Sequence, residues 1–583
     1  MILAQETWVA ASATRNWCMA DPVLDWLNLY GQANGFTPDN LQPDYDPATD
    51  MNLFLREKGI AFERAVMNLV EARFEVVHIA NDRRDASDPA MYDRTLDAMR
   101  QGVQIIYQPV VRDSERGTFG MPDLLVRSDV LNRLVREAVL SFEESIKPAP
   151  GLDGAHHYRV VDIKFTNLDL SAKGFVGNVG SDRRRKAQLL VYNRALGEMQ
   201  GWEPWQAYLL GRSWAQRDER GDSCFDRLAP ADMTDPKLAT LVDEAVDWVR
   251  RVRTQGASWE VLPKPSVPEL HPNMSNTQDA PWHKAKREIA EKTGELTQLW
   301  RVTPTNRPNA LATGVSAMDD PRCNSALFGL ADSYAAKLHH IIETNRPSQP
   351  KLVRPDRVST DCITWREPRP LEFYVDFETV SDLDDDLSQM PKKGGQPLIF
   401  MIGCGHIEDR RWKFSVFTTN RLAEPDEASI IEAWISHMDA VRARLWPDGS
   451  PLVFHWSHAE TSTLNTAYNS ARKRHQRAWP DLNWYDFLSK VMREEPVTVK
   501  GALAFGLKAV ARAMHGNELI ETEWDNGPGD GLAAMVGAWR CDAAARKSGG
   551  SMSDVPLMKD IERYNEVDCK VMWEIVSYLR QNH

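Results

Sequence analysis

The segment 372–379, EFYVDFET, alternates in the pattern of a β-strand whose side chains point to opposite faces. Asp376 and Glu378 fall on the same face, where side chains two positions apart are separated by about 7 Å. Two carboxylates at that separation raise each other's pKa unless a cation lies between them. The segment therefore predicts a strand that brings two acids to a divalent-metal site. The alternative is an edge strand with a solvated acidic face.

Two later features of the C-terminal region supply partners for this strand. Apolar segments at 397–405 and 410–418 predict a hairpin that continues the same sheet. The last expected helix, 559–580, has an apolar stripe that includes both Tyr564 and Asp568. These two side chains are one turn apart and face the core, where a carboxylate is costly unless it has a partner. A third acid is therefore expected opposite the strand.

A strand D-x-E followed by a late helical Y-x-x-x-D resembles the DEDD exonucleases of the RNase H-like fold, in their tyrosine-containing branch. Within that group the sequence is most similar to the YprB-like domain, which is often found behind a RecB-like nuclease. The resemblance implies that Asp376, Glu378 and Asp568 bind two metal ions and that Tyr564 helps to position the attacking water. It also implies trimming of nucleic-acid ends in the 3′→5′ direction.

The remaining metal ligand departs from the better-known pattern of that group. An Asp is expected after the middle strand, which we place at 450–456, but the following residues contain none. Glu460 is the acid that this stretch offers, and its longer side chain would shift the metal. Asp486, at the end of the next expected strand, is the alternative ligand.

Another set of polar residues follows a fixed order along the N-terminal region. An acid on the apolar stripe of a helix precedes a Pro-Asp at a strand start, an Asp-x-Lys on the next strand, and a helical Gln-x-x-x-Tyr. In chain order these residues are Glu63, Asp123, Asp162 with Lys164, and Gln188 with Tyr192. Each has an ordinary structural explanation when it is taken alone, such as a surface ion pair for the Asp-x-Lys.

The order of all four elements resembles the RecB-like branch of the PD-(D/E)XK nucleases. The resemblance implies that Glu63, Asp123 and Asp162 hold Mg²⁺ or Mn²⁺, which are hard ions that prefer oxygen ligands. It makes Lys164 a catalytic residue, which orients the attacking water or neutralises developing charge. It implies that Gln188 and Tyr192 support the site or the bound strand.

A run of cations precedes the Gln-x-x-x-Tyr and adds a separate indication. It consists of Arg183, Arg184, Arg185 and Lys186. Cations at a helix N-terminus oppose the helix dipole, so helix stability does not explain them. Contact with a phosphate backbone would explain them, and a solvated charged loop is the alternative. A second run, RKRHQR at 472–477, lies at an expected helix C-terminus, where the dipole favours cations anyway.

Composition restricts the cofactors and the cellular setting. The net charge of −13 argues against broad nonspecific nucleic-acid binding, although acids that hold metals also contribute negative charge. The seven cysteines form no CxxC pair, so we expect neither an iron–sulfur cluster nor a disulfide framework. The sequence contains no GxxxxGK[ST] motif, so we expect no nucleotide cofactor. Without a signal peptide or a long apolar run, a cytoplasmic protein with no membrane partner is expected.

Proline-rich segments divide the chain into three regions. We expect an α/β (α+β) multidomain protein with a PD-(D/E)XK restriction-endonuclease-like domain at 1–260, a small helical linker at 261–350, and an RNase H-like domain at 351–583. Residues 289–322 resemble a helix-hairpin-helix element, but the usual glycine-bearing hairpin is absent from the turn. A packing spacer between domains is the alternative for that segment.

The sequence thus favours a metal-dependent nuclease with two active sites. The RecB-like site would cut DNA and the DEDD site would trim ends, with RNA as the alternative substrate. Processive action would need a partner such as a helicase, because the chain lacks a motor motif. The opposing hypothesis is a binding or scaffold protein built from nuclease folds in which one or both sites are inactive.

Overall fold

The computed structural model describes residues 7–456, 464–524 and 529–583. The chain divides into two units. The first unit comprises Met1–Pro43, Asn52–Lys292 and Asp385–Gly395, and the second comprises Asp44–Met51, Thr293–Asp384 and Gln396–His583. The main division falls inside residues 261–350, the segment that the sequence predicts to be a linker. Both units combine helices with mixed sheets, which confirms the α/β multidomain class.

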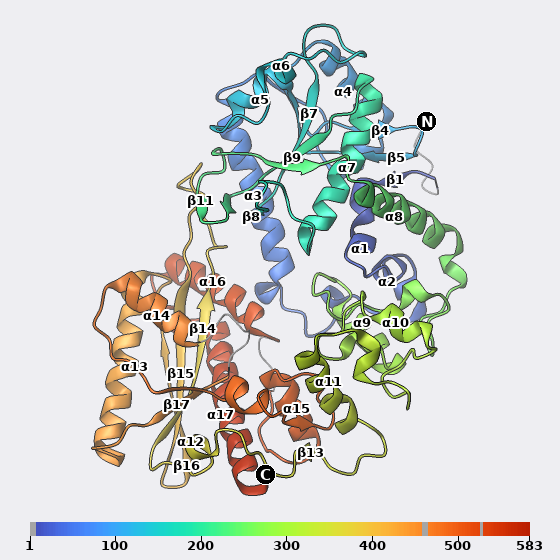
Figure 1. The fold of residues 1–583 in the computed structure, drawn as a ribbon. Helices are drawn as coiled ribbons and strands as arrows, with labels where there is room; N and C mark the ends of the chain where they lie inside the picture. The colour runs from blue at the N-terminus through green and yellow to red at the C-terminus, as the bar shows by residue number, and fades with distance from the viewer. Residues whose placement is uncertain (1–6, 457–463, 525–528) are drawn as a thin grey trace. The chain divides into compact units, whose positions relative to one another are not determined.

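In the described part of the first unit, the main sheet has the strand order β12–β9–β7–β6–β3–β2. Figure 1 labels β7 and β9, two neighbouring strands of this sheet. These strands are β12 (Ala229–Asp232), β9 (Gln206–Leu210), β7 (Tyr158–Ile163), β6 (Leu124–Arg127), β3 (Ile105–Tyr107) and β2 (Val76–His78). β7 pairs in parallel with β9 and antiparallel with β6. The predicted Asp-x-Lys strand is therefore an inner strand of this sheet, with Lys164 directly after its end.

Alternating side chains of β7 pack against different helices. Val161 and Ile163 join the apolar cluster of α3 (Met51–Glu71). Val160 joins the cluster of α7 (Ser181–Gln200), which also packs against α8 (Pro236–Gln255). Asp162, on the same face as Val160, consequently points to the α7 side of the sheet.

Shorter elements complete the first unit. Its helices also include α1 (Arg15–Cys18), α2 (Val23–Trp26), α4 (Pro89–Arg100), α5 (Ser128–Leu134), α6 (Phe142–Ser145) and α9 (His283–Thr293). Its other strands are β1 (Val9–Ala10), β4 (Val111–Asp113), β5 (Thr118–Gly120), β8 (Asn167–Leu170), β10 (Ser213–Gln216) and β11 (Glu219–Gly221). The segment Asp385–Gly395 also belongs here, because buried Asp385 accepts a hydrogen bond from Arg212 at 3.3 Å.

The described part of the second unit has a sheet with the strand order β16–β15–β14–β17–β18. These strands are β16 (Arg411–Thr418), β15 (Leu398–Glu408), β14 (Glu372–Val380), β17 (Leu452–His455) and β18 (Trp484–Asp486). β15 is antiparallel to both β14 and β16, whereas β17 is parallel to β14 and to β18. The predicted acid-bearing strand and the predicted hairpin are both confirmed.

The two faces of β14 are covered by different helices. Phe373, Val375 and Phe377 pack against α13 (Glu424–Leu445) in one apolar cluster. Tyr374 faces the opposite way and shares a cluster with residues of α17 (Pro556–Asn582). Figure 1 shows α13 and α17 on opposite sides of the sheet. The acids of β14, which alternate in phase with Tyr374, therefore face α17.

The rest of the second unit is mainly helical. Its elements are α10 (Arg307–Ala312), α11 (Asp332–Thr344), α12 (Cys362–Trp365), α14 (Leu464–His475), α15 (Leu507–Gly516), α16 (Gly531–Ser548) and a small pair of strands, β13 (Val353–Arg354) and β19 (Thr498–Val499). Across the described residues of both units, no helix has the length and apolar character needed to cross a membrane.

Candidate functional site

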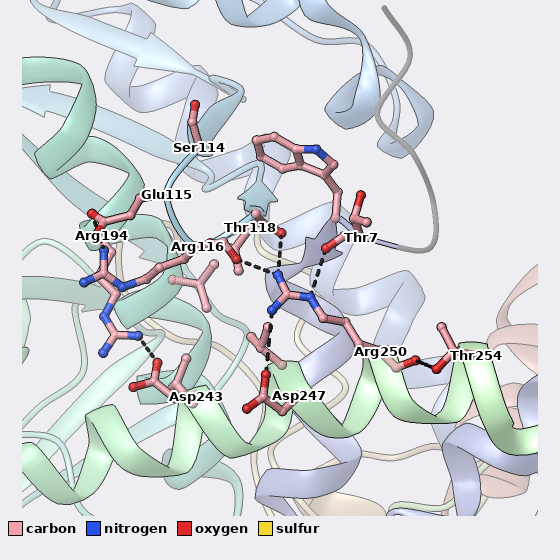
Figure 2. Close-up of a pocket in the computed structure, with 15 residues that line it drawn as sticks. Thr7, Ser114, Glu115, Arg116, Thr118, Arg194, Asp243, Asp247, Arg250 and Thr254 are labelled. Atoms are coloured by element: carbon pink, nitrogen blue, oxygen red, sulfur yellow. Dashed lines mark hydrogen bonds and ion pairs between the residues drawn. The ribbon is translucent and has the colours of Figure 1, made fainter.

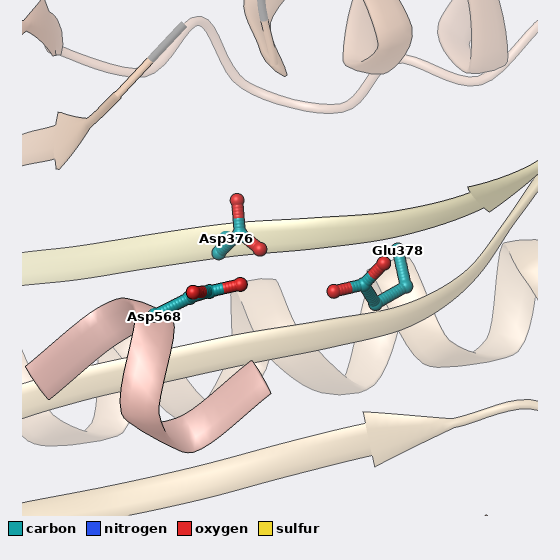
Figure 3. Close-up of side chains that lie close together, drawn as sticks. All are labelled: Asp376, Glu378 and Asp568. Carbon is teal, nitrogen blue, oxygen red and sulfur yellow. The ribbon is translucent and has the colours of Figure 1, made fainter. Parts of the chain in front are cut away.

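Three buried carboxylates converge in the second unit. Asp376 and Glu378 extend from β14 toward Asp568 of α17 (Figure 3). One ligand oxygen from each lies within 4.8 Å of the others, and the residues are only 7%, 6% and 3% exposed. Among the described residues, no other group of three or more His, Cys, Asp or Glu side chains meets that distance. The arrangement is a set of oxygen donors of the type that Mg²⁺ and Mn²⁺ accept.

Burial and mutual repulsion make these acids difficult to ionise together. Burial raises the pKa of Asp376 well above its usual range, and the charges of Glu378 and Asp568 raise it further. Burial, followed by the charge of Asp568, raises the pKa of Glu378 to about 8. Within the described residues, none of the three carboxylates forms an ion pair. The cluster therefore has an excess of negative charge that a cation would relieve.

Neutral hydrogen-bond donors surround the cluster. The Asn565 amide donates to Asp376 at 3.2 Å and to Glu378 at 3.4 Å. The indole N–H of Trp524 donates to Asp568 Oδ1 at 2.9 Å. Each of these bonds fixes the orientation of a carboxylate without neutralising its charge.

Among the described residues, half-buried Lys508 of α15 is the cation whose charge acts on Asp568, but it forms no ion pair with the three carboxylates. Its ammonium lies 4.3 Å from the centre of the Tyr564 ring and donates to the carbonyl of Gly529 at 2.7 Å. Its charge lowers the pKa of Asp568, but burial outweighs it and raises that pKa to about 6. Tyr564 is one helical turn before Asp568 on α17. Burial, followed by the charges of Asp568, Glu378 and Asp376, raises the pKa of its phenol.

Two local features hold α17 close to the sheet. Gly403 of β15 pairs with Asp376, and a Cβ at position 403 would lie 1.9 Å from the Asn565 side-chain oxygen. A side chain at position 403 would therefore displace the Asn565 amide, which glycine leaves in place between strand and helix. Near the other end of α17, Arg580 donates two hydrogen bonds of 2.8 Å to Glu372, the first residue of β14. Strand and helix are thus fixed in register, which brings Asp568 opposite the two strand acids.

The fourth ligand expected from the sequence is not located. Glu460 lies in 457–463, outside the residues that the structure describes. Asp486 is at the end of β18 and accepts hydrogen bonds from Ser489 N at 3.3 Å and Ser489 Oγ at 2.7 Å. β17 separates β18 from β14, so two strand spacings, or about 9.6 Å, lie between them. Asp486 is not a member of the compact group.

The first unit brings Asp123, Asp162 and Lys164 together. Asp123 precedes β6, which pairs with β7, and its Oδ2 accepts from the backbone N–H of Ile163 at 2.6 Å. The Lys164 ammonium lies 2.6 Å from Asp162 Oδ2 and 3.6 Å from Asp123 Oδ2. The pattern of Pro-Asp followed by Asp-x-Lys on adjacent strands therefore gives two acids that share one lysine.

Burial and neighbouring charges act in opposite directions on the pKa values of Asp123 and Lys164. Burial and the neighbouring charge of Asp162 raise the pKa of Asp123 well above its usual range, although Lys164 lowers it. Burial alone would lower the pKa of Lys164, but the charges of Asp123 and Asp162 outweigh burial and raise it. The lysine consequently stays charged and balances part of the acidity.

Glu63 of α3 stands apart from that pair of acids. Its Oε1 accepts hydrogen bonds from the Tyr107 hydroxyl at 2.7 Å and from the Gln108 amide at 3.2 Å. It is close enough for its charge to raise the pKa of Asp123. Its ligand atoms nevertheless do not form, with both Asp123 and Asp162, a group within 4.8 Å. Two of the three expected ligands are therefore adjacent, and the third is held at the side.

Gln188 and Tyr192 of α7 form a hydrogen-bonded pair beside the acids. The Gln188 amide donates to the Tyr192 hydroxyl at 2.6 Å. Burial raises the pKa of Tyr192, and the charge of Asp162 adds to that effect. The spacing of one helical turn predicted that these two side chains share one side of the helix, and that prediction is confirmed.

Two of the four cations in the basic run at the start of α7 have partners within the protein. Arg185 pairs with Asp182 at 2.9 Å, and the buried Lys186 ammonium donates to Asn178 Oδ1 at 2.6 Å. Arg183 is exposed, whereas Arg184 is half-buried. The run is therefore not a uniform solvated patch, because its members differ in burial and in partners.

A separate cavity of about 770 Å³ in the first unit contains none of the residues predicted for either site (Figure 2). Its cations are held by the protein itself. Arg194 pairs with Asp243 at 2.6 Å, and Arg250 donates to the carbonyls of Thr7 at 3.0 Å and Arg116 at 2.6 Å. These contacts fix the ends of the surrounding segments to α8. We therefore regard the cavity as structural and not as the reaction site.

The sequence matches no protein-family model, and no curated protein sequence matches it significantly.

Proposed function

We propose that the chain is a metal-dependent nuclease with two active sites, one in each unit. The observation that carries the proposal is the convergence of Asp376, Glu378 and Asp568 within 4.8 Å in a buried position. Like charges at about 4 Å repel by about 4 kcal/mol at an effective dielectric constant of 20. Among the described residues these three groups form no ion pair, and a ligand that supplies positive charge best explains why the fold gathers them.

The residues present fit Mg²⁺ or Mn²⁺ at this position. Their donors are carboxylate oxygens alone, which suits a hard divalent cation. When bound, such a cation would polarise a phosphodiester and lower the pKa of a coordinated water. Asn565 and Trp524 would hold the carboxylates in orientation, and Tyr564 would contact the reacting groups from α17. This set supports the RNase H-like, DEDD-type interpretation of the second unit, with trimming of nucleic-acid ends.

In the first unit, Asp123 and Asp162 would be the metal-binding acids of a PD-(D/E)XK-type site that cuts DNA. Lys164 lies 2.6 Å from Asp162 and would neutralise charge that develops on the phosphate. Gln188 and Tyr192 would support the adjacent strand. Glu63 would join the site if its hydrogen bonds to Tyr107 and Gln108 were exchanged for a metal.

One observation favours a second candidate function, in which the first unit binds nucleic acid without cutting it. Glu63 is already held by two hydrogen bonds, and Lys164 already balances the remaining acids. On that hypothesis only the second unit is a nuclease.

Purified protein with end-labelled single- and double-stranded DNA and RNA separates these proposals, in Mg²⁺, Mn²⁺ or EDTA. Asp162→Asn and Asp376→Asn are compared with wild type and with the double variant. Two active sites require that the single variants lose different products and that the double variant loses both. If Asp162→Asn changes no product, the first unit only binds. Wild-type protein that cleaves nothing with either metal contradicts the nuclease proposal.

A further inference from the structure

Two arginines from distant segments meet at the N-terminal end of α7. Helix α1 packs against α7, and Arg15 of α1 donates to the carbonyl of Gln278 at 2.8 Å. The side-chain amide of Gln278 donates in turn to Ser181 Oγ, at 2.9 Å, on the first residue of α7. Arg184 is three positions after Ser181 and so lies on the same side of the helix. Gln278 thereby holds Arg15 beside the turn that carries Arg184.

Neither guanidinium group has a full set of partners. In the part of the chain that the structure describes, Arg184 forms no hydrogen bond or ion pair, and its Nε is buried. The Nε of Arg15 is also buried and without a hydrogen bond. The acid of this helical turn, Asp182, is engaged by Arg185 at 2.9 Å. A buried cationic donor without an acceptor is costly, which indicates that an acceptor binds here in the working protein.

The acids nearest to Arg15 are also engaged elsewhere. Asp25 accepts from Asn16 at 2.7 Å and from Trp248 at 3.0 Å. Asp279 pairs with the buried Lys286 at 2.6 Å. Burial lowers the pKa of Arg184 to about 10, and the charges of Arg15 and Arg185 lower it further, with no acid acting in the opposite direction. The surroundings of Arg184 are therefore electropositive, in contrast to the overall charge of −13.

We propose that Arg15 and Arg184 bind a phosphate group of the nucleic-acid strand held by the first unit. The inference rests on the proposed nuclease function of that unit. Guanidinium groups recognise phosphate through paired charge-assisted hydrogen bonds. Arg184, Gln188 and Tyr192 follow one another at intervals of four residues, so they share one side of α7. Arg184 is about 12 Å along the helix from Tyr192, which lies beside Asp162.

The test measures binding of fluorescent single-stranded oligonucleotides to the full-length protein in EDTA, where no cleavage occurs. Affinity is determined over a range of salt concentrations for wild type, Arg184→Gln, Arg184→Lys and Arg15→Gln. We expect Arg184→Gln to weaken binding about tenfold and to reduce the slope of log K against log salt by about 0.7, the contribution of one phosphate contact on a single strand. Arg184→Lys should restore most of the slope, because it keeps the charge.

Arg217→Gln is the matched control, because it removes the same charge from the exposed turn between β10 and β11. It should leave both the affinity and the slope unchanged. Oligonucleotides with and without a 5′-phosphate show which phosphate is bound. If the protein prefers the phosphorylated oligonucleotide and Arg184→Gln removes that preference, the site binds a terminal phosphate. Equal binding of both oligonucleotides indicates an internal phosphate. A variant that binds with wild-type affinity and slope contradicts the phosphate site. Wild-type protein that binds no oligonucleotide contradicts the proposed function itself.

Discussion

In the first unit a lysine lies between the acids, whereas in the second unit three acids face one another across a strand and a helix. Lys164 is within 3.6 Å of both Asp123 and Asp162. Lys508, whose charge acts on Asp568 of the second cluster, points instead to the Gly529 carbonyl and the Tyr564 ring. The first site therefore supplies one positive charge of its own to offset its two acids, whereas among the described residues the second cluster has no ion pair.

This difference follows from which elements carry the acids. Asp162 and Lys164 are two positions apart on β7, so alternation alone brings both to one face. Asp376 and Glu378 also share a strand face, but the third member comes from a helix that supplies a further acid. At the second site, the described hydrogen bonds to the acids come from neutral donors such as Asn565 and Trp524. Metal binding should consequently stabilise the second unit more than the first.

The largest effect should follow from removing the internal cation of the first site. Lys164→Met keeps most of the side-chain volume and should reduce cleavage at that site by about 10²–10³-fold. It should also increase the stabilisation by Mn²⁺, because Asp123 and Asp162 then resemble the second cluster. The readouts are product formation and thermal unfolding with and without metal. Lys508→Met serves as the control and should affect only the end-trimming product; equal loss of both products in Lys164→Met would contradict two independent sites.

A smaller effect is expected from loosening one carboxylate of the second cluster. Trp524→Phe removes the indole N–H that Asp568 accepts and should lower end trimming by about 10–100-fold, the range for residues that orient metal ligands. Trp573→Phe is a matched control on α17, since that half-buried indole stacks on Trp412 at 5.6 Å. Comparable losses in the two variants would mean that Trp524 acts through general packing.

The sequence predicted the elements that carry strong periodic patterns. Strands β7 and β14 and helices α7 and α17 lie where alternation and helical spacing indicated, because each buries one defined face. The same patterns placed Asp162 with Lys164, and Asp376 with Glu378, on common faces. The position of Asn565 was also open to prediction, because it is three residues before Asp568 on α17. Its spacing alone did not predict a contact with the acids, since an Asn in a helix has many ordinary roles.

Other residues of the sites depend on tertiary contacts that leave no local pattern. Lys508 and Trp524 belong to α15 and the segment after it, and only the packing of that region brings them to the acids. Glu63 lies on the predicted helix stripe, yet its hydrogen bonds to Tyr107 and Gln108 could not be read from spacing. The partner of the second basic run could not be predicted from spacing either, because Arg474 pairs with buried Glu427 on a different helix, α13.

The pH dependence of metal stabilisation tests the unbalanced charge of the second cluster. Glu378 has a folded pKa of about 8, against an unfolded value of about 4.3. The folded protein holds the proton between these values, so this contribution to stability is complete below about pH 4.3 and is lost as the pH rises toward 8. Bound Mn²⁺ replaces the proton. The rise in Tm on adding Mn²⁺ should therefore be larger near pH 8 than near pH 5.5. The difference should be about 2–4 °C for each kcal/mol by which Mn²⁺ stabilises the fold more at the higher pH.

Glu378→Gln provides the reference for that measurement, since it removes one titrating acid and keeps the shape of the side chain. Its Mn²⁺-induced shift should be smaller and less dependent on pH. Asp162→Asn, combined with wild-type Glu378, should retain the pH dependence of the second unit. Equal shifts at both pH values in the wild type would show that the second cluster does not need an external cation.

The smallest effect concerns the support that α7 gives to the first site. Gln188→Met removes the hydrogen bond to the Tyr192 hydroxyl while keeping the length of the side chain. The loss should lower the free energy of unfolding by about 0.5–1.5 kcal/mol, the net value of one hydrogen bond, and reduce first-site cleavage less than Lys164→Met does. Urea unfolding and product formation measure the two quantities. Helix α7 contributes neutral groups to the first site, whereas α17 contributes an acid to the second. Mn²⁺ should therefore stabilise Gln188→Met as much as it stabilises the wild type. A smaller stabilisation by Mn²⁺ in the variant would mean that the Gln188–Tyr192 pair holds the acids in place.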